Sequence, residues 1–216
     1  MKILALETST SEGGIALMQD QEVLTEHLFK TNENFGQNLF PLIEKVFKEA
    51  KLILKDIDLI AVNAGPGSYT GMRVGVTCAN TLSWVNQIPS VGISNLYNMA
   101  FSTDHQGKIG VLIYGNEKEA FFASFQKDQK GFHQIIADEK ITWETAQIKS
   151  ELCDKVIYFS TKKEVLPNIP NLITWQPKVN YIGKAGLNYF NTQKEKNFGK
   201  ILPNYLREFE VTPKVK

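Results

Sequence analysis

The chain has 216 residues, of which 43% are hydrophobic, so it can bury a core either as one domain or as two small lobes. Lys and Arg total 24 against 23 for Asp and Glu, which gives a formal net charge of +1. This balance excludes a strong electrostatic grip on a long phosphate backbone, so any nucleic acid would have to be held mainly by something else.

The expected compartment is a reducing cytoplasm. The two cysteines, Cys78 and Cys153, are too few for a disulfide framework. Met1 and Lys2 run directly into an apolar segment without the parts of a signal peptide, and no apolar run approaches the length needed to span a membrane.

The first half of the chain predicts the element order β-β-β-α-β-α-β-α. Short apolar segments bounded by turn residues predict strands, and apolar residues at helical spacing predict helices. The strands are expected at residues 3–6, 15–18, 23–29, 59–64 and 90–93. One helix is expected at residues 35–50, a second begins after residue 68, and a third runs from the cap at Ser94-Asn95 through Phe101. Three strands of antiparallel type followed by alternating units imply a parallel extension of one sheet.

A polar break at residues 102–107 precedes a second series of elements of the same kind. Strands are expected at residues 109–114, 120–126, 132–137 and 156–160, with helices at 143–152 and 181–191. The pattern β-β-β-α-β therefore occurs twice, and the repeat is architectural because the two halves share little sequence. We predict an N-terminal lobe at residues 1–103 and a smaller C-terminal lobe with a tail at residues 104–216.

The segment from Leu59 to Trp84 predicts a buried strand, a tight turn and a helix. Gly65, Pro66 and Gly67 break the strand, and Ser68 or Thr70 can cap the helix that follows. Backbone N–H groups beside a helix start favour an anion, so Gly65, Gly67 and Ser68 are candidates for a phosphate site. The alternative is a plain sharp connection, since no Gly-Lys-Ser/Thr of a Walker loop follows.

A hydroxyl and glycine turn after the first strand adds Thr8 and Ser9 to these candidates. Strand, turn and strand surround nucleotide phosphates in some kinases and ATPases, and two successive β-β-β-α-β halves are typical of the actin-like ATPase and sugar-kinase (ASKHA) superfold. The sequence therefore predicts an α/β protein of that superfold, with an abbreviated second lobe.

Within that superfold, the chain resembles the bacterial TsaB (YeaZ) family. The similar segments follow in the expected order over nearly the whole chain: Leu4-Ala-Leu-Glu-Thr-Ser-Thr10, Gly65-Pro-Gly-Ser-Tyr-Thr-Gly-Met-Arg-Val-Gly75, Pro89-Ser-Val-Gly-Ile-Ser94 and Pro203-Asn-Tyr-Leu-Arg207. The resemblance implies a subunit needed to make N6-threonylcarbamoyladenosine at position 37 of tRNAs that read codons beginning with A.

The resemblance also implies the partners of such a subunit. A related, TsaD-like catalytic subunit would transfer the threonylcarbamoyl group, and a TsaE-like ATPase would join the complex. The chain itself would be non-catalytic and need no cofactor of its own, with ATP or ADP at the partner interface. It would form a homodimer when alone and contact tRNA only through the complex.

Two departures from the family pattern weaken the prediction of a nucleotide site. Glu7 stands where family members usually have Asp, and its extra methylene would move a carboxylate that could hold a magnesium-bound water. Tyr114-Gly-Asn-Glu117 replaces a segment of Asp-Ala-Arg type, which weakens the expectation of a phosphate contact from the second lobe.

Catalysis by a metal is not expected. The catalytic relative carries two histidines one helical turn apart, a spacing that holds a metal, and Asn95 and Met99 stand at the matching positions. The three histidines, His27, His105 and His133, lie far apart in the sequence.

Two other functions remain as alternatives. The first is an active small-molecule kinase or ATPase of the same superfold, which would use Thr8, Ser9 and the turn at Gly65 for phosphates. The second is a peptidase, which would need either a metal or Ser68, Cys78 or Cys153 activated by a histidine.

A stripe of small residues along the helix after residue 68 predicts a close helix contact. Each glycine inside a helix costs about 1 kcal/mol against alanine, so a second backbone is expected nearby. The contact could be internal, or it could be with a partner protein, which is the prediction made here. The predicted partner surface comprises Gly71, Arg73, Gly75, Cys78, Ala79 and Leu82, with Leu39 and Ile43 of the neighbouring helix.

Overall fold

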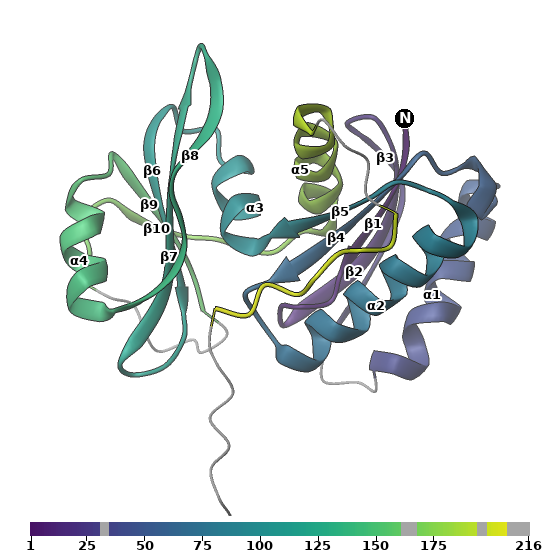
Figure 1. Cartoon of the computed structure of the whole chain (residues 1–216), viewed down its shortest axis with the longest axis horizontal. Coiled ribbons are helices and arrows are strands. Elements are labelled where there is room, and N and C mark those ends of the chain that lie inside the picture. Colours follow the sequence, from purple (N-terminus) through teal and green to yellow (C-terminus); the bar gives the residue numbers. More distant parts are fainter. Residues whose placement is uncertain (31–34, 161–167, 194–197, 207–216) are drawn as a thin grey trace, which may run out of the picture.

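The computed structural model describes residues 1–30, 35–160, 168–193 and 198–206. Two five-stranded sheets form the centres of two lobes that lie side by side, with helices on the faces of the sheets (Figure 1). No helix among the described residues is long and apolar enough to cross a membrane.

The first sheet has the strand order β3-β2-β1-β4-β5. Its strands are β1 (Lys2–Glu7), β2 (Glu12–Gln19), β3 (Glu22–Lys30), β4 (Leu59–Gly65) and β5 (Ser90–Ser94). The first three strands pair antiparallel, whereas β4 and β5 extend the sheet in parallel, as the element order predicts.

Helices cover both faces of the first sheet. Strand side chains alternate between the two faces, so each face has its own apolar cluster. Helices α1 (Phe35–Ala50) and α2 (Tyr69–Asn86) pack on one face, and α5 (Val179–Thr192) packs on the other. The short helices η1 (Leu54–Asp56) and α3 (Asn95–Phe101) precede β4 and follow β5, respectively.

The second sheet repeats this topology with the order β10-β9-β6-β7-β8. Its strands are β6 (Gly107–Tyr114), β7 (Glu119–Asp128), β8 (Gly131–Thr142), β9 (Lys155–Phe159) and β10 (Leu172–Thr174). Helix α4 (Trp143–Glu151) packs on one face of this sheet, and α3 packs on the other. The equivalent strand orders confirm the predicted architectural repeat.

The predicted boundary between residues 103 and 104 falls in the connection from α3 to β6, but the assignment of everything after it to the second lobe is wrong for α5. Apolar side chains of α5, among them Val179, Ile182 and Ala185, pack against β1, β2 and β4. The chain therefore returns to the first lobe after β10, a strand of three residues that the sequence did not indicate.

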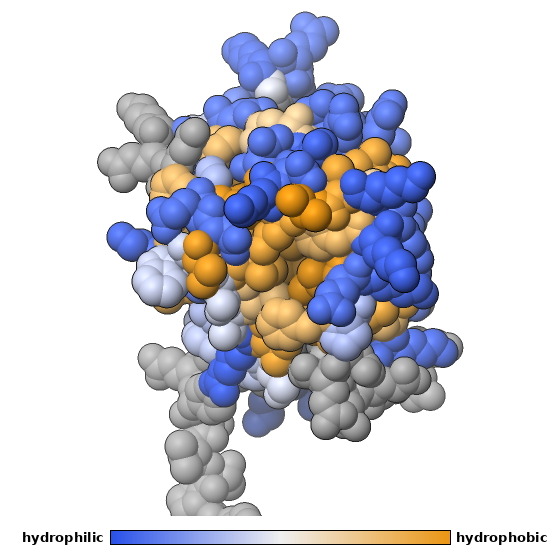
Figure 2. Space-filling view, turned by 90° about the vertical axis from the view of Figure 1, so that its right-hand side faces the viewer, coloured by the Kyte–Doolittle hydropathy of each residue, from blue (hydrophilic) through white to orange (hydrophobic). Residues whose placement is uncertain are grey.

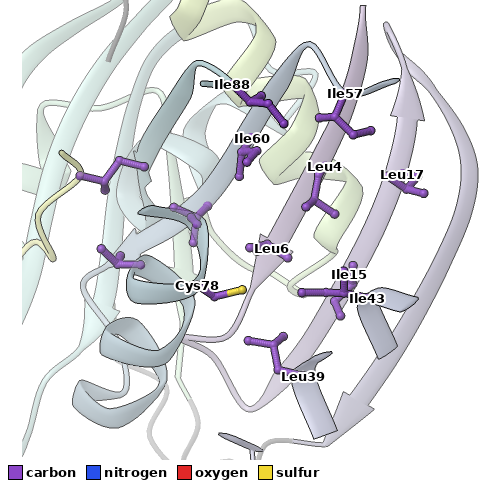
Figure 3. Close-up of a cluster of buried hydrophobic side chains, with 14 of the residues drawn as sticks. Leu4, Leu6, Ile15, Leu17, Leu39, Ile43, Ile57, Ile60, Cys78 and Ile88 are labelled. Atoms are coloured by element: carbon purple, nitrogen blue, oxygen red, sulfur yellow. The ribbon is translucent and has the colours of Figure 1, made fainter. Parts of the chain in front are cut away.

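The cluster between the first sheet, α1 and α2 contains the residues that fix these helices to the sheet. Figure 3 shows Leu4, Leu6 and Ile15 from the strands facing Leu39 and Ile43 of α1, with Cys78 of α2 in the same cluster. Removing a side chain of this size from a packed core typically costs about 2–5 kcal/mol, so these residues position α1 and α2 firmly.

Candidate functional site in the cleft between the lobes

A cleft of about 460 Å³ lies between the two lobes. The first lobe contributes the turn after β1 and the loop before α2, and the second lobe contributes the ends of β6 and β9. The lining residues include Ser9, Thr10, Ser11, Gly67, Ser68, Tyr69, Tyr114, Phe159 and Ser160. The structure thus brings the predicted phosphate candidates Ser9, Gly67 and Ser68 to one site, beside aromatic and hydroxyl groups of the second lobe.

The carboxylate of Glu7 bonds the turn after β1 and is not among the residues that line the cleft. It is buried, and its Oε1 accepts hydrogen bonds from the backbone N–H groups of Ser9 (2.7 Å) and Thr10 (3.1 Å) and from the hydroxyl of Ser9 (3.1 Å). The side-chain amide of Asn63 donates to Oε2. Burial raises the pKa of Glu7, against the lowering effect of these hydrogen bonds.

The turn after β1 and the start of α2 are bonded directly to each other. The buried hydroxyl of Thr8 donates to the carbonyl of Gly71 (2.7 Å), and the N–H of Ser68 donates to the carbonyl of Ser9 (2.7 Å). A Cβ atom at Gly67 would lie 2.4 Å from that carbonyl of Ser9, so glycine is required for this backbone approach. Thr8 therefore has a structural role here and is absent from the cleft lining.

The turn before α2 has the local structure that its sequence predicts. Gly65 has φ +98°, which favours glycine, and a cis peptide bond joins it to Pro66. Of the two predicted caps, Ser68 is the one used, because its hydroxyl accepts from the N–H of Gly71 (3.2 Å).

These bonds use several of the N–H groups that could otherwise bind a phosphate. The N–H groups of Ser9, Thr10, Ser68 and Gly71 all have partners within the chain. None of the described lining residues is a lysine or arginine, and a buried carboxylate lies directly beneath the turn. Nucleoside phosphates are normally bound by free N–H groups together with a cation, and the described lining residues supply no cation.

The two positions on α3 that match the histidines of the catalytic relative do not form a ligand pair. The buried amide of Asn95 donates to the carbonyl of Pro66 (3.1 Å), and Met99 lies in the core of the second lobe. His27 bonds Glu49 on the outside of the first lobe (2.8 Å). Within the described ranges, no three His, Cys, Asp or Glu residues are grouped so as to hold a metal ion.

The cysteines and Ser68 show no sign of an activated nucleophile. Burial raises the pKa of the Cys78 thiol to about 11, and burial also raises the pKa of Cys153. Both thiols are therefore protonated near neutral pH. The Ser68 hydroxyl acts as a helix cap.

The predicted partner surface is oriented differently from what the sequence led us to expect. Added Cβ atoms would lie 1.9 Å from the Thr8 carbonyl oxygen at Gly71 and 2.2 Å from Thr8 Oγ1 at Gly75, so both glycines face the turn after β1. Four further residues of the prediction belong to the lobe's own core: Leu39, Ile43, Cys78 and Ala79. The assumption that these residues form an exposed face is wrong, because the small residues accommodate the turn after β1.

Other residues of α1 and α2 remain accessible. Of the predicted set, Arg73 is exposed and Leu82 is half-buried. Larger apolar side chains are more exposed: Phe40 of α1 at 52%, and Trp84 and Val85 of α2 at 68% and 64%. Figure 2 views the side of the molecule on which α1 lies and shows hydrophobic side chains gathered in its centre, with hydrophilic ones around them.

The segment 198–206 is bonded to α2 and β4 of the first lobe and to β8 of the second lobe. Sequence patterns did not reveal these contacts. The side chain of Asn80 exchanges two hydrogen bonds with the backbone of Ile201, and Arg73 Nε donates to the Tyr205 hydroxyl (2.8 Å). The N–H of Asn204 donates to the carbonyl of Ala64, and its side-chain amide donates to Asp138 on β8 (2.8 Å). Pro203-Asn-Tyr-Leu, quoted above for the family resemblance, lies in this segment; Arg207 lies outside the described residues.

Comparison with known proteins fits this geometry. The model of the family "TsaD: tRNA N6-adenosine threonylcarbamoyltransferase" matches residues 29–186, well over half of the chain. The chain belongs to this family, on its TsaB/YeaZ branch. The tRNA threonylcarbamoyladenosine biosynthesis protein TsaB of Bacillus subtilis is 30% identical to it over 142 residues, which cover 65% of this chain and 62% of that protein. The chain thus matches less than two thirds of that relative's length.

Solved structures show the same fold. YeaZ from Pseudomonas aeruginosa superposes with a TM-score of 0.77 at 20% identity, over 95% of this chain and 99% of that chain. A ROK family protein from Streptococcus pneumoniae gives a TM-score of 0.52 at 9% identity, over 88% of this chain and 98% of that chain. The predicted ASKHA-type α/β fold is therefore confirmed.

Proposed function

We propose that the chain is a non-catalytic subunit in the synthesis of N6-threonylcarbamoyladenosine at position 37 of tRNAs that read codons beginning with A. The family supports this pathway, and one structural observation supports the non-catalytic role. The N–H groups of Ser9, Thr10, Ser68 and Gly71 are bonded within the chain, at the two turns where a kinase of this fold would bind phosphates. The chain would act in the cytoplasm and require no cofactor of its own.

The proposed catalytic partner is a TsaD-like subunit, and a TsaE-like ATPase would join them. Because the TsaD-like subunit belongs to the same family, it would present an equivalent pair of helices. We propose that it packs on the exposed apolar residues of α1 and α2, with Phe40 and Val85 as contacts, and that the same surface forms a homodimer in the free chain. ATP or ADP would lie at that interface, and tRNA would be contacted through the complex.

The test of the proposed function is nucleoside analysis of tRNA from a strain depleted of this chain. Threonylcarbamoyladenosine should fall on depletion and return when the wild-type chain is supplied. Unchanged modification after complete depletion would contradict the proposal.

With a net charge of +1, the chain alone should bind tRNA weakly at physiological salt.

An active kinase or ATPase is the alternative function, and turnover of ATP by the purified chain separates the two. We expect no magnesium-dependent hydrolysis above that of a buffer blank without the partner. Sustained turnover that Ser9→Ala abolishes would favour the kinase or ATPase instead.

A further inference from the structure

A second pocket, of about 490 Å³, lies on the second lobe beside the turn from β6 to β7 and the start of α4. The aromatic residues Tyr114 and Trp143 and the buried Ile169 line it. Glu117 and Glu144, both exposed, line the same pocket. The pocket thus combines aromatic faces with carboxylates, and it has no part in the function proposed above.

The aromatic walls are held in place by the surrounding structure. The ring centroids of Tyr114 and Trp143 are 6.0 Å apart at an interplanar angle of 33°. The indole N–H of Trp143 donates to the carbonyl of Asn116 (2.9 Å), and Tyr158 packs against the indole in a T-shaped arrangement. Because these contacts fix the indole before any ligand arrives, binding would cost little side-chain entropy.

The turn that carries Glu117 is equally well ordered. The N–H groups of Gly115 and Asn116 both donate to the carbonyl of Glu119, and the side chain of Asn116 accepts from two further N–H groups of the turn. The Tyr114 hydroxyl donates to Glu117 (3.2 Å), which holds the carboxylate beside the ring. This turn is the Tyr114-Gly-Asn-Glu117 segment, in which the sequence differs from the resemblance described above. Two of its residues, Tyr114 and Glu117, line the pocket.

The charged residues among the described lining of the pocket favour a cation. None of its described lining residues is a lysine or arginine. On the neighbouring strand, Lys140 pairs with Glu119 (3.2 Å), and Lys149 of α4 pairs with Glu139. Aromatic faces attract organic cations through their quadrupole, and carboxylates add to that attraction, whereas both oppose a phosphate.

We propose that this pocket binds a small organic cation of the alkylammonium class. The apolar part of the ligand lies against the rings of Tyr114 and Trp143, and its charge lies toward Glu117 and Glu144. The geometry therefore assigns to the second lobe a ligand site separate from the cleft between the lobes.

The test is an NMR titration of the full-length chain with choline, in which the indole N–H signal of Trp143 is followed. The chain has three tryptophans, so Trp143→Phe assigns the signal. The uncharged isostere 3,3-dimethylbutan-1-ol has the shape of choline without its charge. We expect a saturable shift of the Trp143 signal with choline. The isostere should bind at least about fivefold more weakly than choline.

Variants locate the site and its charge. Glu117→Gln combined with Glu144→Gln should weaken choline binding about fivefold, since both residues are exposed and the fold is preserved. Trp84→Phe, at an exposed tryptophan outside the pocket, is the control and should leave the affinity for choline unchanged. Equal binding of the isostere, or unchanged choline binding by the double variant, would overturn the proposal, as would the absence of any shift up to roughly 0.1 M choline.

Discussion

At the scale of single residues, the small side chains of α2 decide how closely the turn after β1 approaches the helix. Thr8 lies against Gly71 and Gly75, and its hydroxyl bonds the Gly71 carbonyl. Glycine in a helix is normally a loss of about 1 kcal/mol against alanine, so these positions exchange helix propensity for a close backbone contact.

The first prediction follows from that contact. A Cβ atom at Gly71 would lie 1.9 Å from a backbone oxygen, which cannot rotate away. Gly71→Ala should therefore destabilise the chain by about 2–3 kcal/mol, although alanine favours the helix. Denaturant unfolding measures the change. Thr77→Ala, at an exposed position of the same helix, should alter the free energy of unfolding by less than about 0.5 kcal/mol, and a stabilised Gly71→Ala variant would show that the turn is not packed as described.

The second prediction concerns the charge of Glu7. Its folded-state pKa is raised, chiefly by burial, so the protonated form favours the folded state. This contribution is fully present below the ordinary pKa of about 4.5 and is lost as the pH rises through the folded pKa. Glu7→Gln removes this titration. Any other effect of the substitution on the free energy of unfolding is the same at every pH and does not change the comparison. The stability of the wild type relative to Glu7→Gln should therefore rise as the pH falls from neutral, and a fall would contradict the assigned burial.

At the scale of elements, the strands and helices of the first lobe follow from the sequence, but the direction in which α2 faces does not. Helical spacing places Gly71, Gly75 and Ala79 on one stripe, and the pattern cannot say whether the sheet or a partner lies against it. The deciding group is Thr8, more than sixty residues away in the sequence, whose hydroxyl reaches the Gly71 carbonyl. Contacts between distant segments are invisible to local periodicity.

The third prediction tests the corrected partner surface. Phe40→Asp on α1 and Val85→Asp on α2 place a charge on exposed apolar positions, so partner binding and self-association should fall at least about tenfold while the melting temperature stays near that of the wild type. Pull-down with the TsaD-like subunit and gel filtration measure this.

The matched control for these variants is Ile148→Asp. Ile148 is an exposed apolar residue, 59% accessible, on α4 of the other lobe. It should leave both associations unchanged. Normal binding by well-folded Phe40→Asp and Val85→Asp would place the partner elsewhere on the molecule.

At the scale of the whole molecule, the segment 198–206 and the carboxylate of Asp138 join the lobes. Asp138 of β8 accepts from Ser94 at the start of α3 and from Asn204 of the segment, and Gln134 donates to its other oxygen. Burial raises the pKa of Asp138, against the effect of these donors. Sequence analysis missed this junction because its members come from three segments that lie far apart in the sequence.

The two-lobed fold itself was accessible from the sequence, because each half repeats the same order of elements. The return of α5 to the first lobe was not, since an amphipathic helix such as Val179–Thr192 does not record which of two sheets it covers. The cleft was predicted in part: Ser9, Gly67 and Ser68 do line it, but the N–H groups of Ser9 and Ser68 are bonded within the chain, which only the geometry shows.

The last prediction concerns the junction at Asp138. Asp138→Ala removes the acceptor of Asn204 and Ser94, so the segment 198–206 keeps its bonds to α2 and β4 but loses its direct hydrogen bond to the second lobe. Amide hydrogen exchange should then become at least about tenfold faster at Asn204 and Tyr205, while the strands of both sheets keep their protection. Asp128→Ala, which removes a carboxylate that accepts only a local turn hydrogen bond from Lys130 on the same hairpin, is the control. Unchanged exchange at Asn204 in Asp138→Ala would mean that the bond to the Ala64 carbonyl holds the segment in place without help from the second lobe.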